Sequence, residues 1–110
     1  MRPGWIVPLT AGLLFSSPGL AGPSGEEPSV EEGRKVFTEL AQPGCPICHT
    51  LADAGATGAI GPDLDELAPD EAKVAAAVTN GVGIMPAFNE TLTSEQIAAV
   101  ARYVATVTGQ

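Results

Sequence analysis

Two cysteines and a histidine, in the run Cys45-Pro46-Ile47-Cys48-His49, constrain this chain more than any other feature. A Cys-x-x-Cys-His run is the attachment motif of c-type haem. Residues three apart lie on one side of a helical turn, about 5–6 Å apart at Cβ, so both thiols can bond to one porphyrin. The imidazole of His49 then reaches the iron from one side of the ring. The motif predicts one covalent haem c, held by Cys45 and Cys48.

Two other uses of these cysteines compete with haem attachment. Cys45 and Cys48 are the only cysteines and have the spacing of a thiol oxidoreductase pair. That interpretation leaves His49 unexplained and requires a βαβ neighbourhood, for which the sequence shows no pattern. A structural zinc site needs four ligands, whereas the chain has two cysteines and one histidine.

The N-terminal residues 1–21 have the pattern of an export signal, with Arg2, an apolar run and small residues up to Ala21. The run is shorter than the roughly 20 residues that a membrane span requires, and no later segment is a candidate span. An apolar N-terminal tail or an uncleaved anchor is the alternative. Residues 22–28 predict a flexible leader. Haem c is attached outside the cytoplasm, so export suits the motif, and in a bacterium it predicts a periplasmic location.

The charge of the chain is strongly acidic, with 13 Asp and Glu against 5 Lys and Arg. Cleavage after Ala21 removes Arg2, which leaves 13 against 4 and a formal charge of −9 on 89 residues. This charge disfavours nucleic acid and anionic membranes as partners and favours transient docking to a redox protein with a basic surface. Since so short a chain buries little surface by itself, we expect the haem to form part of the core.

Residues 29–110 predict one small helical domain. The first helix covers residues 30–41 and begins with the capping-box pair Ser29 and Glu32. Its expected apolar face consists of Val30, Val36, Phe37, Leu40 and Ala41. Gly33 is unfavourable inside a helix by about 1 kcal/mol, which indicates that another backbone approaches there. We expect Tyr103 to pack on Phe37 across that contact.

The middle of the chain predicts a loop, a proline turn and a second helix. Residues 51–61 are mostly small and predict a loop that lies against a ring face. In the following Gly61-Pro62-Asp63-Leu64 turn, we expect the Pro62 carbonyl to accept the second ring N–H of His49, although an ordinary turn is the alternative. The second helix is expected to have Pro69 at its first position and to end at Asn80-Gly81.

Met85, in the run Gly83-Ile84-Met85-Pro86-Ala87-Phe88, is the only methionine after the signal segment. A thioether is a soft ligand for haem iron, and Pro86 stiffens the loop that presents it. We therefore predict His49 and Met85 as the axial iron ligands, with Ile84 and Phe88 packed on the haem; core filler is the alternative for Met85. A last helix over residues 94–108 follows the capping pair Thr93 and Gln96.

Together, these motifs resemble the class I cytochrome c family over nearly the whole chain after the signal. The resemblance implies an all-α fold in which the first and last helices cross and a middle helix and loops surround one covalent haem. It also implies electron transfer without catalysis. More narrowly, residues 48–55 and 63–67 are similar to the cytochrome that serves periplasmic sulfite dehydrogenases, which predicts such an enzyme as electron donor.

Two functional alternatives stay open at this point. With both axial positions filled, the protein carries electrons through an exposed haem edge, framed by Pro46, Ile47, Ile84, Pro86 and Ala87. If Met85 were displaced or unbound, the protein would instead bind or sense a gas at the haem. Without haem, Cys45 and Cys48 would return to the thiol oxidoreductase interpretation.

Overall fold

The computed structural model describes residues 28–109 together with Gly4 and Gly12. The predicted signal peptide, apart from those two glycines, and residues 22–27 of the predicted leader lie outside the described residues. In the part of the chain that is described, no helix is long and apolar enough to cross a membrane.

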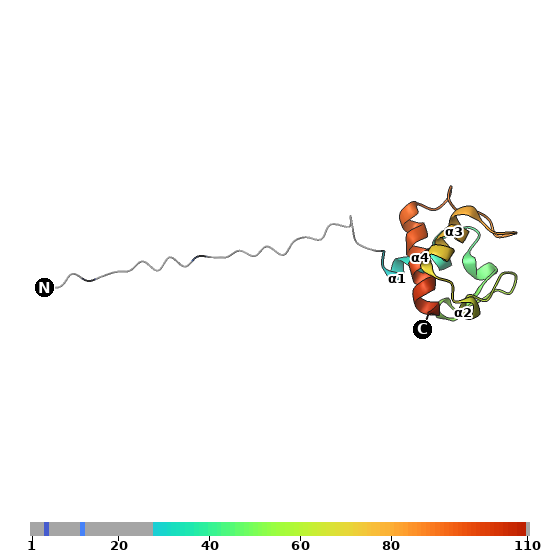
Figure 1. Cartoon of the computed structure of the whole chain (residues 1–110), viewed down its shortest axis with the longest axis horizontal. Helices are drawn as coiled ribbons and strands as arrows, with labels where there is room; N and C mark the ends of the chain where they lie inside the picture. Colours follow the sequence, from blue (N-terminus) through green and yellow to red (C-terminus); the bar gives the residue numbers. More distant parts are fainter. Residues whose placement is uncertain (1–3, 5–11, 13–27, 110) are drawn as a thin grey trace.

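Within residues 28–109 the regular structure is mostly helical, as predicted (Figure 1). In chain order the elements are α1 (Val30–Lys35), η1 (Val36–Leu40), η2 (Cys45–Ile47), β1 (Thr50–Leu51), η3 (Ala52–Ala54), β2 (Ala56–Thr57), α2 (Leu64–Leu67), α3 (Glu71–Asn80) and α4 (Ser94–Thr108). The first and last helices lie against each other, and α3 packs on α4 from another side (Figure 1).

The contact between α1 and α4 depends on Gly33. A Cβ at this position would lie within 3.0 Å of the Ala99 carbonyl oxygen and of the Tyr103 Cβ. The close approach of α4 predicted from this glycine is therefore confirmed. So is the packing of Phe37 on Tyr103, whose ring centroids lie 5.9 Å apart at an interplanar angle of 65°.

The start of α1 has its predicted cap, but its end differs from the prediction. The Ser29 Oγ accepts the backbone N–H of Glu32 at 3.1 Å. After Lys35 the chain forms the π-helical turn η1, closed by a bond from the Ala41 N–H to the Val36 carbonyl at 2.9 Å. This wider turn places Ala41 in the core and leaves Leu40 41% exposed, so the prediction that Leu40 shares the buried face is wrong.

The loop predicted over residues 51–61 is in part a small antiparallel hairpin. Strands β1 and β2 pair Thr50 with Thr57 and Leu51 with Ala56, and both Leu51 and Ala56 are buried. Gly55, with φ +65°, ends the η3 turn between the strands. Strands of two residues are too short to show an alternating pattern, which is why the sequence did not reveal them.

The helix starts in the second half follow acidic or hydroxyl caps. The Asp70 Oδ1 accepts the Lys73 N–H at 2.7 Å, so Asp70 is the N-cap of α3. The prediction of Pro69 at the first helical position is therefore wrong, because an aspartate is the stronger cap and Pro69 precedes it. The bounds of α4 and its capping box of Thr93 and Gln96 are confirmed.

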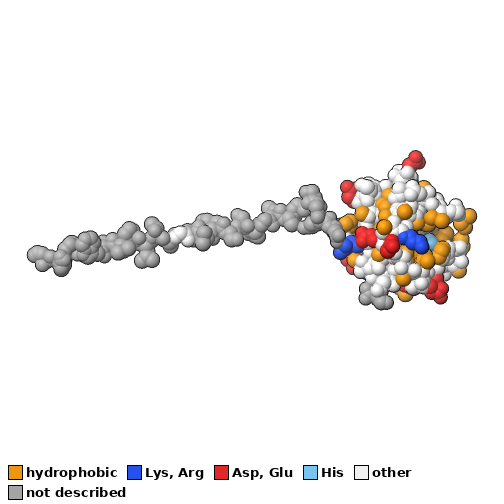
Figure 2. Space-filling view, in the orientation of Figure 1, with side chains coloured by type: hydrophobic (Ala, Val, Ile, Leu, Met, Phe, Trp, Pro, Cys, Tyr) orange, Lys and Arg blue, Asp and Glu red, His pale blue; other side chains and the backbone are white. Residues whose placement is uncertain are grey.

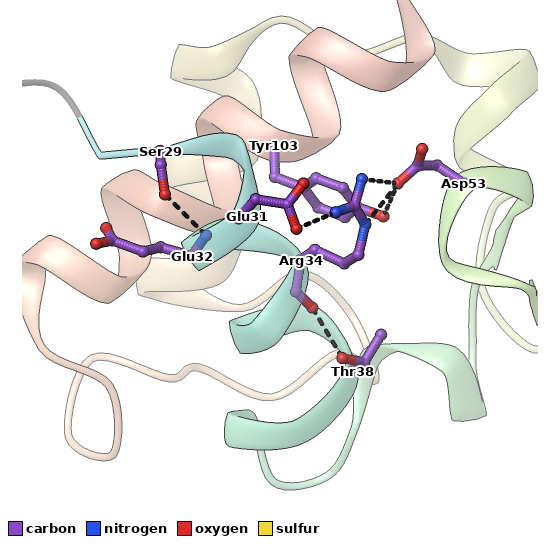
Figure 3. A network of polar contacts seen from close by, with 7 residues as sticks. All are labelled: Ser29, Glu31, Glu32, Arg34, Thr38, Asp53 and Tyr103. Atoms are coloured by element: carbon purple, nitrogen blue, oxygen red, sulfur yellow. Dashed lines mark hydrogen bonds and ion pairs between the residues drawn. The ribbon is translucent and has the colours of Figure 1, made fainter.

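A polar network that the sequence did not reveal joins α1, η3 and α4 (Figure 3). The Tyr103 hydroxyl, on a fully buried ring, donates to the Asp53 Oδ2 at 2.6 Å. The Arg34 guanidinium pairs with Glu31 and, at 3.0 Å, with the same Asp53 oxygen, and lies 5.4 Å from the Tyr103 ring centroid. The hydrogen bond from Tyr103 lowers the pKa of Asp53 most, and Arg34 lowers it further.

Replacing Tyr103 by Phe should destabilise the protein by about 1 kcal/mol at neutral pH, since one hydrogen bond to the exposed Asp53 carboxylate is lost. Folding lowers the pKa of this carboxylate, so its ionised form stabilises the folded protein at any pH above the unfolded pKa of about 3.9. This stabilisation is lost as the pH falls through the pKa in the folded state. The difference between wild type and Tyr103→Phe should therefore narrow below about pH 4. Urea unfolding at neutral and acid pH measures it, and a difference independent of pH would contradict the assignment.

The face of the molecule seen in Figure 2 carries acidic and basic side chains next to one another, with apolar side chains around them. Among the described residues, six large apolar side chains are exposed: Leu40, Ile47, Ile60, Leu67, Val82 and Ile84. Four of them, Ile60, Leu67, Val82 and Ile84, also line the cavity described next. The exposed apolar surface is thus concentrated where the cavity opens.

Candidate haem-binding site

All seven residues that the sequence assigns to the site line one cavity: Cys45, Cys48, His49, Pro62, Ile84, Met85 and Phe88. The cavity has a volume of about 420 Å³, which is within the usual range of cofactor pockets. Its walls come from the loops on either side and from buried side chains of η1, α3 and α4, among them Phe37, Val78 and Val104. An apolar cavity that contains two thiols, one imidazole and one thioether fits a covalently bound porphyrin.

The turn η2 presents the two cysteines and the histidine together. Both the Cys48 N–H and the His49 N–H donate to the Cys45 carbonyl, at 3.2 and 3.0 Å, which winds the motif into one tight turn. Burial raises the pKa of the Cys45 thiol to about 11. Redox cysteines are instead activated by a lowered pKa, so this environment disfavours a thiol oxidoreductase.

The imidazole of His49 contacts Gly61 and Pro62, in the segment that follows the hairpin. Its Nδ1 lies 2.8 Å from the Pro62 carbonyl oxygen, so in the Nδ1–H tautomer it donates to Pro62 and leaves Nε2 with a free lone pair. The Gly61 N–H donates to the Cys48 carbonyl at 2.7 Å. A Cβ on Gly61 would lie 2.8 Å from the His49 Cε1, so only glycine lets the chain pass this close to the ring.

Gly58, like Gly61, lets the chain pass close to the haem motif, and the sequence did not reveal either contact. A Cβ there would lie 2.5 Å from the Pro46 carbonyl oxygen and 2.7 Å from the backbone nitrogen of His49. Its N–H donates to the His49 carbonyl at 3.2 Å. The available signal was the pair Gly58 and Gly61, because a glycine permits a close backbone contact.

The loop that carries Met85 follows directly from the end of α3. Gly81, at φ +76°, turns the chain, and a Cβ there would lie 2.7 Å from the Met85 carbonyl oxygen. Val82 and Met85 exchange backbone hydrogen bonds at 3.1 and 2.8 Å, which closes the loop on itself. Met85 is half-buried, Phe88 is 4% exposed, and Ile84 is 85% exposed at the mouth of the cavity.

Comparison with known proteins gives matches to a protein-family model, to a known protein and to a solved structure. Residues 28–104 match the protein-family model described as cytochrome C oxidase, cbb3-type, subunit III. Cytochrome c6 of Gloeothece citriformis (strain PCC 7424) is 37% identical over 98 residues, which cover 84% of this chain and 79% of that protein. The crystal structure of the c-type cytochrome SorU from Sinorhizobium meliloti has 58% sequence identity and a TM-score of 0.70, and the match covers 74% of this chain and 92% of that one.

The family match covers every residue that lines the cavity, and the three matches agree on the class of protein. The family match alone spans more than half of the chain. The solved structure adds high sequence identity to a shared fold. The chain belongs to the monohaem cytochrome c family, in which it is an electron carrier with one covalent haem c and not a catalyst.

Proposed function

We propose that Cys45 and Cys48 form the thioether bonds to the haem and that His49 and Met85 are its two axial iron ligands. The observation that carries this proposal is that all four side chains line one apolar cavity. When bound, the haem supplies one-electron chemistry by cycling between ferrous and ferric iron. The Pro62 carbonyl orients the His49 ring, and the closed Val82–Met85 loop holds the thioether. The apolar walls exclude water, which together with methionine ligation raises the reduction potential.

A gas-binding protein is the alternative, and it requires Met85 to leave the iron. The two backbone hydrogen bonds between Val82 and Met85 fix the backbone from which the thioether extends, which favours a retained ligand. Carbon monoxide discriminates between the two functions. The reduced wild-type protein should not bind it at neutral pH, and binding would favour the gas-sensing function.

The electron crosses, in this proposal, at the apolar rim of the cavity. Ile60, Val82 and Ile84 are 64%, 64% and 85% exposed and line the cavity, and Ile47 beside the cysteines is 60% exposed. Pro86 and Ala87 are exposed and Pro46 is half-buried in the same two segments. An apolar contact surrounded by the acidic surface of the chain suits transient docking to a partner with a basic surface.

The proposed electron donor is a periplasmic sulfite dehydrogenase, from which the electron passes to a terminal acceptor. The similarity of residues 48–55 and 63–67 to the cytochrome of such enzymes supports this donor. The likeness to the c-type cytochrome SorU supports a bacterial carrier of the same kind. Export to the periplasm by the signal over residues 1–21, with cleavage near Ala21, would place the carrier in the same compartment.

Replacing Ile84 by Glu should slow reduction by a sulfite dehydrogenase at least about tenfold, because the new carboxylate loses its water in an apolar contact and gains no partner. The absorption spectrum should not change, since Ile84 is 85% exposed. Ala76→Glu adds the same charge at an exposed position of α3 that does not line the cavity, and it should have a much smaller effect. Stopped-flow kinetics measure both, and equal rates for wild type and Ile84→Glu would exclude this docking face.

A further inference from the structure

Lys73 differs from every other side chain on the cavity wall. Among the described residues that line the cavity, only His49 and Lys73 have side-chain N–H donors, and none is an Asp, Glu, Arg, Asn, Gln, Ser, Thr, Tyr or Trp. The Nδ1 of His49 is bonded to Pro62, and its Nε2 is the proposed iron ligand. Lys73 is therefore the one cation on this wall that is available to a ligand.

A haem brings two propionate carboxylates to a cavity that is otherwise apolar. A carboxylate that leaves water without a partner is strongly disfavoured, and the acidic charge of this chain adds to that cost. The other cations of the domain lie elsewhere. Arg34 is paired with Glu31 and Asp53, and neither Lys35 nor Arg102 lines the cavity.

The position of Lys73 leaves its ammonium group free to make such a pair. It is the third residue of α3, where its backbone N–H donates to the Asp70 cap, and its side chain is exposed. Within residues 28–109, no hydrogen bond or ion pair involves the ammonium. The long aliphatic stem of a lysine can lie along an apolar wall while its charged end reaches a polar group.

The acidic side chains on the elements around Lys73 do not line the cavity. Asp65 accepts the Ala52 N–H at 2.8 Å, and Asp70 accepts the Lys73 N–H, so both are engaged with backbone. None of the acidic residues of α2, α3 and α4 or of their caps lines the cavity: Asp63, Asp65, Glu66, Asp70, Glu71 and Glu95. The cavity thus presents a cation without a competing anion.

We propose that Lys73 pairs with a haem propionate and thereby sets the pH range over which the reduction potential varies. This inference rests on the proposed binding of haem in the cavity. A cation beside the propionate keeps it ionised to lower pH. The ammonium also repels the additional positive charge of ferric iron, so it favours the ferrous form and raises the reduction potential.

Spectroelectrochemical titration of Lys73→Gln across the acid and neutral pH range tests the pairing. The midpoint potential should fall relative to wild type, and its pH-dependent region should move to higher pH. Lys73→Arg, which keeps the charge, should behave as the wild type does. Lys35→Gln, which removes an equal charge from exposed α1 away from the cavity, should leave the pH-dependent region unchanged.

Lys73→Gln and Lys35→Gln profiles that coincide would overturn the pairing. Since Lys73 is exposed, its substitution should not impair folding, and the Arg variant separates a loss of charge from a loss of packing. The comparison is made between proteins that all carry haem. Its result is therefore independent of whether Met85 ligates the iron, which the near-infrared spectrum tests separately.

Discussion

A Cys45→Ala/Cys48→Ala variant recovered without haem is expected to lose most of the far-UV helical signal of the wild-type protein. The side chains that line the cavity include Phe37 of η1, Val74 of α3 and Val104 of α4, so a haem bound there would lie among the elements that form the core. At about 24 cal/mol per Å³, an empty cavity of about 420 Å³ costs at most on the order of 10 kcal/mol. That is comparable to the whole stability of a small domain, about 5–15 kcal/mol.

Circular dichroism at matched protein concentration measures this effect. The single variant Cys48→Ala, which keeps one thioether bond and hence the haem, is the control and should retain its helical signal. Free haem added to the double variant should restore part of the signal, which separates the loss of the cofactor from the loss of two side chains. A haem-free double variant with the helical signal of the wild type would show that the fold does not depend on the haem.

Replacing Gly33 by Val is expected to destabilise the protein by at least about 3 kcal/mol, at the upper end of the cost of overpacking. The first added carbon would already lie within 3.0 Å of the Ala99 carbonyl oxygen and the Tyr103 Cβ. Backbone cannot give way as a flexible side chain does, so α1 and α4 would have to separate. The Tyr103 hydroxyl bond to Asp53 would be strained by the same movement.

Gly44→Ala is a control for the loss of a glycine that has no close neighbour, although Gly44 also lines the cavity. A Cβ at Gly44 would have its nearest neighbour at 3.7 Å, and its φ of −66° is allowed for any residue. The change in stability at this site should stay within about 0.5 kcal/mol. Denaturant unfolding of the haem-bearing proteins measures both variants. A Gly33→Val protein as stable as Gly44→Ala would mean that the two helices are not in close contact.

The features that the sequence predicts well are those set by local rules. The bounds of α4 follow from its capping box and its apolar period, and both are observed. The haem motif needs only five consecutive residues, and Gly33 could be interpreted because a glycine inside a helix has few other reasons to be there. In each case the physical cause lies within a few residues of its effect.

The features that the sequence does not predict depend on contacts between distant segments. The Tyr103 and Asp53 side chains are 50 residues apart, and nothing near either residue indicates the other. The π-helical turn η1, which exposes Leu40, departs from the period of an α-helix, and the pattern of apolar residues does not reveal such a departure. The contact between Gly61 and the His49 ring arises only when the chain returns past the motif, so the spacing of the glycines gave no partner.

The assignment of His49 and Met85 as axial ligands of a covalent haem is tested most directly by the near-infrared absorption of the oxidised protein. The wild type should show the weak charge-transfer band of a methionine sulfur bound to ferric iron, together with a sharp α-band after reduction. Met85→Ala should keep the haem and lose the near-infrared band. A wild-type protein that carries haem but lacks this band would contradict the assignment.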